Sequence, residues 1–327
     1  MIYKLQGCKK SAVIGWMAGM LLLAGCTQDK LADASQGEML PEGKYPVTFT
    51  ATGLEIAPTS RATADGTWTK DDEVAVQIGS EVRKYTANSG GTSTTLEAAS
   101  GVTPFYWQKT NETKSVSAWY CGTGYNASLP TSWTWSVKTN QNSDNGYQKS
   151  DFLYAKGTLS FNGNKSLTFY HQVAKVVVNI RKYGVASDAS KISSVTIKAI
   201  TDGTFTTSLT NNCGLSAKSA GTPSGITPYK LSNPNTGVIF EDGENGETAL
   251  ASYQALVIPQ VLGTNTPIEI QIEGYDTFTY PPTGSWEGGT QYTYNLTIDG
   301  KKVTATVTTD DISWTNGSSG SGSVEIE

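Results

Sequence analysis

Histidine is almost absent from this sequence of 327 residues, because His171 is the only one. A single histidine excludes histidine-rich metal sites and catalysis that needs more than one histidine. We interpret His171 as a hydrogen-bonded structural residue rather than a general base. The sequence also lacks a GxSxG nucleophile elbow, a phosphate-binding loop and a dinucleotide fingerprint. We therefore expect a protein that is not an enzyme and that binds no cofactor and no metal.

Cysteine is scarce as well, with four in the whole chain. Cys8 lies in a segment that we expect to be removed, and Cys26 has a separate role described below. The remaining Cys121 and Cys213 have neither the density of a disulfide scaffold nor a CxxC zinc spacing. Two unpaired thiols are the favoured interpretation, and a single disulfide is the alternative.

The first 25 residues predict a cleavable signal peptide. Lys4, Lys9 and Lys10 precede a weakly polar run that is too short to span a bilayer, and this run ends at Leu23-Ala24-Gly25-Cys26. Such an ending resembles a bacterial lipobox, in which the thiol of Cys26 takes the lipid. More than one acyl chain gives stable membrane anchoring. We therefore predict a lipoprotein of the outer membrane, exposed at the surface.

Residues 26–44 form a polar stretch without hydrophobic periodicity and are predicted to be a lipidated tether. Removal of residues 1–25 changes the formal charge from -5 to 21 − 29 = -8. A mildly acidic chain argues against a nucleic-acid partner.

Alternation of apolar and polar residues recurs throughout the rest of the chain, and turn residues separate the runs. The run Tyr45-Pro-Val-Thr-Phe-Thr-Ala alternates cleanly, and Ala174–Ile180 is almost continuously apolar, as in a strand buried on both faces. Asp299-Gly300 is the strongest hairpin signal. The sequence therefore predicts an all-β protein of β-sandwiches or barrels, with a domain boundary near residues 151–157 that separates residues 45–155 from residues 156–327.

Two further features have both a functional and a structural interpretation. The loop from Glu241 to Glu247 is rich in acidic residues and glycine, as calcium sites are, but a solvated turn is favoured. Aromatic residues around Trp133 and Trp135 are of the kind that stacks on sugars when exposed on loops, but alternating aromatics in strands more often pack in a core.

Arg61 lies in Pro58-Thr-Ser-Arg-Ala-Thr-Ala-Asp-Gly, a segment with no apolar period after the first predicted strand. An extended loop with one basic residue is a suitable site for a trypsin-like protease.

The chain ends on the flexible composition Thr315-Asn-Gly-Ser-Ser-Gly-Ser-Gly-Ser, followed by the short alternating run Val324-Glu-Ile-Glu. A terminal strand after a flexible linker is unusual for a closed sandwich.

The order of several segments carries a resemblance across most of the mature chain. These segments are the lipobox at Cys26, Arg61 with Gly66-Thr-Trp-Thr-Lys-Asp-Asp-Glu-Val-Ala-Val after it, Ser150-Asp-Phe-Leu-Tyr-Ala, Leu167-Thr-Phe-Tyr-His-Gln-Val-Ala-Lys-Val-Val-Val-Asn-Ile, Gly284-Ser-Trp-Glu-Gly-Gly-Thr-Gln-Tyr-Thr-Tyr-Asn-Leu, and Trp314. Together they resemble the fimbrillin family of Bacteroidota, the type V pilins and their accessory subunits.

The resemblance implies two tandem transthyretin-like β-sandwiches and a maturation step. An arginine-specific protease would cut at Arg61 and free the first strand, with its core residues Val47, Phe49 and Ala51. A strand from the C-terminal region of another fimbrial subunit would then fill the groove, because an unpaired edge is a template for β-augmentation. The candidate donor positions are Val303, Ala305 and Val307, or Ile312 and Trp314, or Val324 and Ile326.

The resemblance leaves two functions open. The first is a structural subunit of a cell-surface fimbria that assembles by strand donation. The second is a lipid-anchored or tip adhesin that binds a glycan or host ligand without polymerising.

Overall fold

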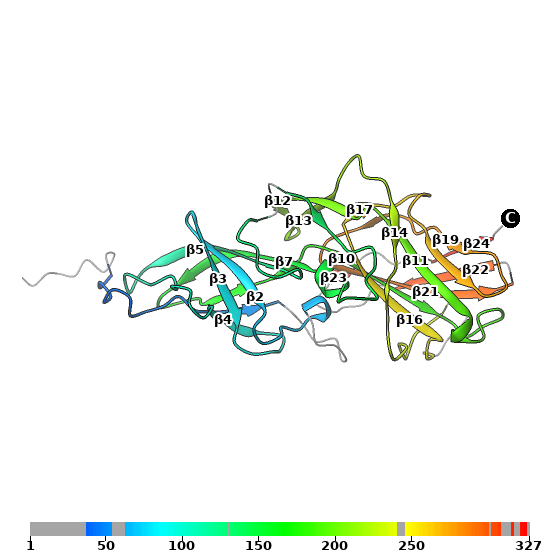
Figure 1. Ribbon diagram of the computed structural model, residues 1–327, viewed down its shortest axis with the longest axis horizontal. Coiled ribbons are helices and arrows are strands. Elements are labelled where there is room, and N and C mark those ends of the chain that lie inside the picture. Colours follow the sequence, from blue (N-terminus) through cyan, green and yellow to red (C-terminus); the bar gives the residue numbers. More distant parts are fainter. Residues whose placement is uncertain are drawn as a thin grey trace, which may run out of the picture. The chain divides into compact units, whose positions relative to one another are not determined.

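The computed structural model describes residues 37–53, 63–129, 131, 133–240, 246–300, 302–308, 315–316 and 321–325. Within these ranges the regular elements are β-strands and three short 3₁₀ helices, η1 (Thr63–Asp65), η2 (Gln148–Ser150) and η3 (Ala189–Lys191). None of the helices in the described ranges is long and apolar enough to cross a membrane. Residues Glu38–Glu327 form one compact unit (Figure 1). The predicted all-β class is confirmed.

An eight-stranded sheet is built from the N-terminal half of this unit. Its strands in spatial order are β8 (Ser166–Thr168), β1 (Phe49–Thr52), β4 (Thr94–Ala98), β3 (Glu81–Ala87), β2 (Glu73–Ile78), β5 (Thr113–Cys121), β7 (Phe152–Ser160) and β9 (Tyr170–His171). All neighbouring pairs are antiparallel except β1 and β8, which run parallel.

This sheet encloses a first hydrophobic core. Val74 and Val76 of β2 are fully buried in it, as the alternating pattern of that strand predicts. Trp68 and Trp107 are its largest side chains, and Trp68 makes edge-to-face contacts with Tyr120 and Phe169, at ring-centroid distances of 5.9 and 5.2 Å. Aromatic pairs of this geometry stabilise a core beyond their buried area.

The C-terminal half contains two larger sheets and two smaller ones. The seven-stranded sheet has the order β15 (Tyr229–Lys230), β16 (Ala251–Val257), β10 (Ala174–Ile180), β21 (Thr290–Asp299), β22 (Lys302–Thr308) and β24 (Ser321–Glu325), and β23 (Thr315–Asn316) also pairs with β21. The four-stranded sheet has the order β14 (Ser224–Ile226), β11 (Ile192–Ala199), β18 (Ile268–Ile272) and β19 (Phe278–Tyr280). The smaller sheets are β13 (Cys213–Ala217), β12 (Asp202–Thr210) and β6 (Trp135–Ser136), and β17 (Gln260–Val261) with β20 (Ser285–Trp286).

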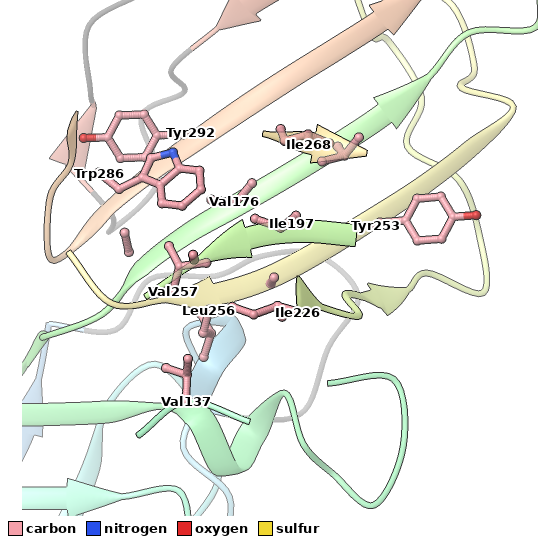
Figure 2. Close-up of a cluster of buried hydrophobic side chains, with 14 of the residues drawn as sticks. Val137, Val176, Ile197, Ile226, Tyr253, Leu256, Val257, Ile268, Trp286 and Tyr292 are labelled. Carbon is pink, nitrogen blue, oxygen red and sulfur yellow. The ribbon is translucent and has the colours of Figure 1, made fainter. Parts of the chain in front are cut away.

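The two larger C-terminal sheets share a second hydrophobic core, as in a sandwich. Figure 2 shows Val176 of β10 beside Ile197 of β11 and Ile268 of β18, all fully buried. Every residue of β10 is buried, which confirms the prediction for this apolar run. It pairs with β16 on one side and with β21 on the other, so it has no free edge.

The hairpin predicted at Asp299-Gly300 is confirmed, because β21 and β22 are antiparallel and Asp299 is opposite Lys302. Gly300 has φ 57°, which a primed turn requires. The predicted domain boundary between residues 155 and 156 falls inside β7, which pairs with β5 along its whole length. The division into two transthyretin-like domains stays a prediction.

Candidate functional site

The strand predicted to be displaceable, β1, is an interior strand of the eight-stranded sheet. It lies between β4 and β8, with Phe49 opposite Leu96 and Ala51 opposite Leu167. Because side chains alternate along a strand, Phe49 and Ala51 point to the same face as Val47 just before the strand. These three residues are 2%, 0% and 0% exposed and belong to the first core. The structure therefore places the three predicted residues together on one buried face.

The chain just before β1 pairs with a different segment. The Val47 N–H donates to the Phe105 carbonyl at 2.7 Å, and the Trp107 N–H donates to the Tyr45 carbonyl at 2.9 Å. Beyond Val47 the strand turns to β4. The hydroxyl of Tyr85, from β3, lies at this change of partner and donates to the Val47 carbonyl at 3.0 Å. Burial raises the pKa of Tyr85 to about 12, so the hydroxyl stays protonated and remains a donor.

The chain leaves β1 through Gly53, which has φ +96°. A Cβ at this position would lie 2.5 Å from the carbonyl oxygen of Phe169, so the close approach of the two segments requires glycine. Residues 54–62, and Arg61 with them, lie outside the described residues, as do Cys26 and the predicted signal peptide.

Immediately after this segment, Asp65 of η1 enters a buried polar cluster. Its Oδ1 accepts from Lys175 Nζ at 3.1 Å, from the Tyr147 hydroxyl at 3.1 Å and from Gln254 Nε2 at 3.2 Å. The ammonium group and the carboxylate are both nearly inaccessible to solvent. Burial, and then the charge of Asp65, raise the pKa of Tyr147 well above its ordinary value. The neighbouring Ala64 is fully buried in the second core.

The candidate donor residues have different positions in the seven-stranded sheet. Val303 and Ala305 of β22 are 1% and 0% exposed, and Val307 is half-buried against the second core. Among the described strands β24 is the last of the sheet and pairs only with β22, with Val324 opposite Val303. Ile312, Trp314 and Ile326 lie outside the described residues.

The groups that suggested other chemistry have structural partners. His171 is 2% exposed and its Nδ1 lies 2.9 Å from Asp151 Oδ1, as expected of a structural histidine. Cys121 and Cys213 are free thiols, and burial raises the pKa of Cys121 to about 12. Among the described residues no group of three or more His, Cys, Asp or Glu is placed to hold a metal ion.

The tryptophans that suggested a sugar platform pack inward. Trp135 is 2% exposed in the second core, and Trp133 is half-buried against the same core. Of the acidic loop, residues 241–245 lie outside the described part, and Glu247 pairs with Arg181 through two hydrogen bonds of 2.6 and 3.2 Å.

Tyr85 and the Asp65 cluster are functional candidates that the sequence did not indicate. Tyr85 lies in Glu81-Val-Arg-Lys-Tyr-Thr-Ala, where no local pattern sets its hydroxyl apart. Asp65 is 110 residues from Lys175 and 189 from Gln254 in the chain, so only the tertiary structure brings the three together.

Comparisons with known proteins agree with this architecture. The model of the fimbrillin-like family matches residues 60–313. A suspected cell adhesion protein of Bacteroides uniformis has a similar structure, with 17% sequence identity, a TM-score of 0.59, and coverage of 84% of this chain and 100% of that one. A second such protein, from Bacteroides ovatus, has 16% identity and a TM-score of 0.56, with coverage of 82% and 96%.

At these identities the two structures bear on the fold alone, and no curated protein matches the chain. The family model is independent of them and spans most of the sequence. The chain therefore belongs to the fimbrillin-like family.

Proposed function

We propose that this protein is a structural subunit of a cell-surface fimbria, a type V pilus. It is exported as a lipoprotein through Cys26 and assembles by β-strand donation after proteolysis at Arg61. The observation that carries the proposal is the position of β1, whose buried side chains fill an interior place in the sheet just before the segment that holds Arg61. A cut there would leave β1 joined to the fold only by noncovalent contacts.

The choice of Arg61 is supported by the other arginines of the chain, of which there are two. Arg83 lies in β3, and its guanidinium donates to the carbonyls of Thr103 and Pro104 at 3.0 and 2.7 Å. Arg181 directly follows β10, and its guanidinium is paired with Glu247. A protease requires an extended segment that can enter its active site, and segments within paired strands do not provide one. The bond after Arg61 is thus the preferred cleavage site for an arginine-specific protease.

The groove left by β1 would be a strong receptor for another strand. It would offer the main-chain groups of β4 and β8 on its two sides and the space of Val47, Phe49 and Ala51 below. Burial of one large apolar side chain stabilises a complex by about 1.5–3 kcal/mol, and main-chain hydrogen bonds add to this. Other fimbrial subunits are therefore the proposed partners.

The donor is better sought in β24 than in β22. Val303 and Ala305 of β22 belong to the second core of their own chain, so withdrawal of β22 would open that core. Within the described part of the chain β24 pairs on one side only, so it can leave with the loss of a single ladder. Val324 and Ile326 are thus the favoured donor positions, and Val303, Ala305 and Val307 the less favoured ones.

A second candidate function is a lipid-anchored or tip adhesin that binds a glycan or host ligand without polymerising. A shallow depression of about 390 Å³ lies over β2, β5 and β7, lined by Gln77, Ser115, Ser117, Lys156 and Thr158 among others. Its polar lining suits a small hydroxylated ligand. No aromatic ring lines it, however, so it lacks the flat apolar surface on which a sugar ring stacks. We therefore favour the fimbrial subunit, and we propose no enzymatic activity.

Limited digestion of the purified lipoprotein with an arginine-specific protease tests the proposal. We expect one cut after Arg61, read by intact mass, followed by SDS-resistant ladders on a gel. Arg61→Gln should remain uncut and monomeric, and deletion of residues 317–327 should leave the cut but stop the ladders. A cut product that stays monomeric would instead favour the adhesin.

A further inference from the structure

The hydrogen-bond ladder between the chain before β1 and the segment 105–107 has one irregular rung. In an antiparallel pair, two opposite residues normally exchange both of their N–H to carbonyl bonds. The Val47 N–H donates to the Phe105 carbonyl at 2.7 Å. The return bond is replaced by a relay, in which the Phe105 N–H donates to the Tyr85 hydroxyl at 3.3 Å and that hydroxyl donates to the Val47 carbonyl at 3.0 Å.

The side chain that makes this relay is held rigidly. Tyr85 is fully buried, and its ring lies 6.4 Å from that of Phe105 and 6.1 Å from that of Phe49, measured between centroids. Phe105 is fixed in turn by the guanidinium of Arg83, which lies 4.2 Å from the centre of its ring. A ring packed on these sides holds its hydroxyl at the Val47 carbonyl.

The relay binds the main chain of the strand in the groove, not its side chains. Val47 is the residue whose carbonyl it binds, and Phe49, two residues later, packs against the same tyrosine ring. A shift of the strand by one residue would turn the carbonyl away and would also direct threonines into the core, because the faces of a strand alternate. The two contacts together therefore define both the register and the apolar face of the occupant.

We propose that Tyr85 sets the register of any strand that occupies this groove, including the strand of a second copy that would replace β1. The inference rests on the proposed strand donation. The groove selects an extended peptide that presents a carbonyl to Tyr85 and, two residues after it, an apolar side chain large enough to contact the ring. Tyr85 is thus the specificity-determining residue for the incoming strand.

Replacement of β1 by a synthetic peptide tests this inference directly. Full-length protein cut after Arg61 is incubated with a peptide of the sequence 44–53, and exchange is followed by mass and by fluorescence polarisation. The same peptide with a thioamide in place of the Val47–Thr48 amide has a weaker acceptor at the Val47 position, because sulfur replaces the carbonyl oxygen. We expect the thioamide to lower affinity about tenfold in the wild type. In Tyr85→Phe the two peptides should bind equally, and both more weakly than the unmodified peptide binds the wild type.

Tyr154→Phe is the matched control. Tyr154 is 1% exposed in the same sheet and its hydroxyl contacts Ser117 Oγ at 3.2 Å, far from the relay in the hydrogen-bond pattern. This variant should keep the full thioamide effect. An equal thioamide effect in Tyr85→Phe and in the control would overturn the register role while leaving strand donation intact.

A second measurement distinguishes strand donation from the register role of Tyr85 when no peptide binds in the groove. Amide hydrogen exchange of residues 45–52 in the uncut protein should be about tenfold faster in Tyr85→Phe than in Tyr154→Phe. If cut wild-type protein keeps β1 and admits no peptide, strand donation fails and the inference about an incoming strand fails with it. If the peptide enters but hydrogen exchange and affinity do not respond to Tyr85→Phe, only the inference fails.

Discussion

The half-buried carboxyl of Asp72 makes the free energy of unfolding depend on pH, and the direction of this dependence can be predicted. Asp72 lies in the turn before β2, where its Oδ2 accepts from the Thr69 N–H at 2.7 Å. Burial raises the pKa of Asp72 from 3.8 to about 6, the hydrogen bond from Thr69 opposes this rise, and the charge of Asp151 adds to it. The ionised form is thus disfavoured in the folded protein.

The magnitude follows from this pKa. A change from 3.8 to about 6 corresponds to about 3 kcal/mol of penalty on ionisation, and solvent screening at a half-buried site reduces this to about 1–2 kcal/mol. Because the folded pKa is the higher one, the penalty is absent below pH 4, grows between pH 4 and 6, and is complete above pH 6. Asp72→Asn removes it and keeps an oxygen for the Thr69 N–H. The variant should therefore be more stable by about 1–2 kcal/mol at pH 7.5 and unchanged at pH 4.

Urea unfolding of both proteins at pH 4, 5, 6 and 7.5 measures this difference, because the other titrating groups are common to both. Asp71→Asn is the control, since Asp71 is exposed and its φ of 71° suits asparagine. Its stability difference should be small, because the exposed Asp71 side chain is solvated in the folded and the unfolded protein alike. A loss of stability in Asp72→Asn at pH 7.5, or a gain of equal size at pH 4, would refute the reasoning.

Three further predictions concern the buried contacts around β1 and after it. Lys175→Met leaves the carboxylate of Asp65 buried without its cation and should lower the free energy of unfolding by about 3–5 kcal/mol, whereas Lys84→Met, at a partly exposed ion pair, should lower it by less than about 1 kcal/mol in the same urea titration. Phe49→Ala should destabilise the uncut protein by about 3–5 kcal/mol in urea and should speed the loss of β1 after a cut, followed by mass. Gly53→Ala should lower the melting temperature by several degrees in calorimetry, because alanine at φ +96° meets a main-chain carbonyl at 2.5 Å.

Local patterns in the sequence predict the strands and their buried faces well. Val47, Phe49 and Ala51 share a face because the period of a strand is two, and this holds whatever the strand pairs with. The hairpin at Gly300 is also local, because its turn residues determine it.

The sequence does not predict which distant segments pair, or in which direction. That β1 runs parallel to β8 and antiparallel to β4 depends on contacts more than 40 residues apart, for which alternation carries no signal. That β7 runs through residue 155 in one continuous ladder with β5 is likewise a pairing that composition does not indicate. The role of Tyr85 arises only where two ladders meet, so nothing near it in the sequence indicates it.

The polar cluster at Asp65 has a consequence for the new N-terminus that a cut after Arg61 would create. A cut after Arg61 would make Ala62 the new N-terminal residue, two positions before the fully buried Ala64. The carboxylate of Asp65, which comes next, is held by Lys175, Tyr147 and Gln254. The new N-terminus would therefore have no long tail that could move freely in solvent or fold back into the groove. The cut would thus divide the chain into a lipidated fragment that contains β1 and a remaining part whose fold is undisturbed.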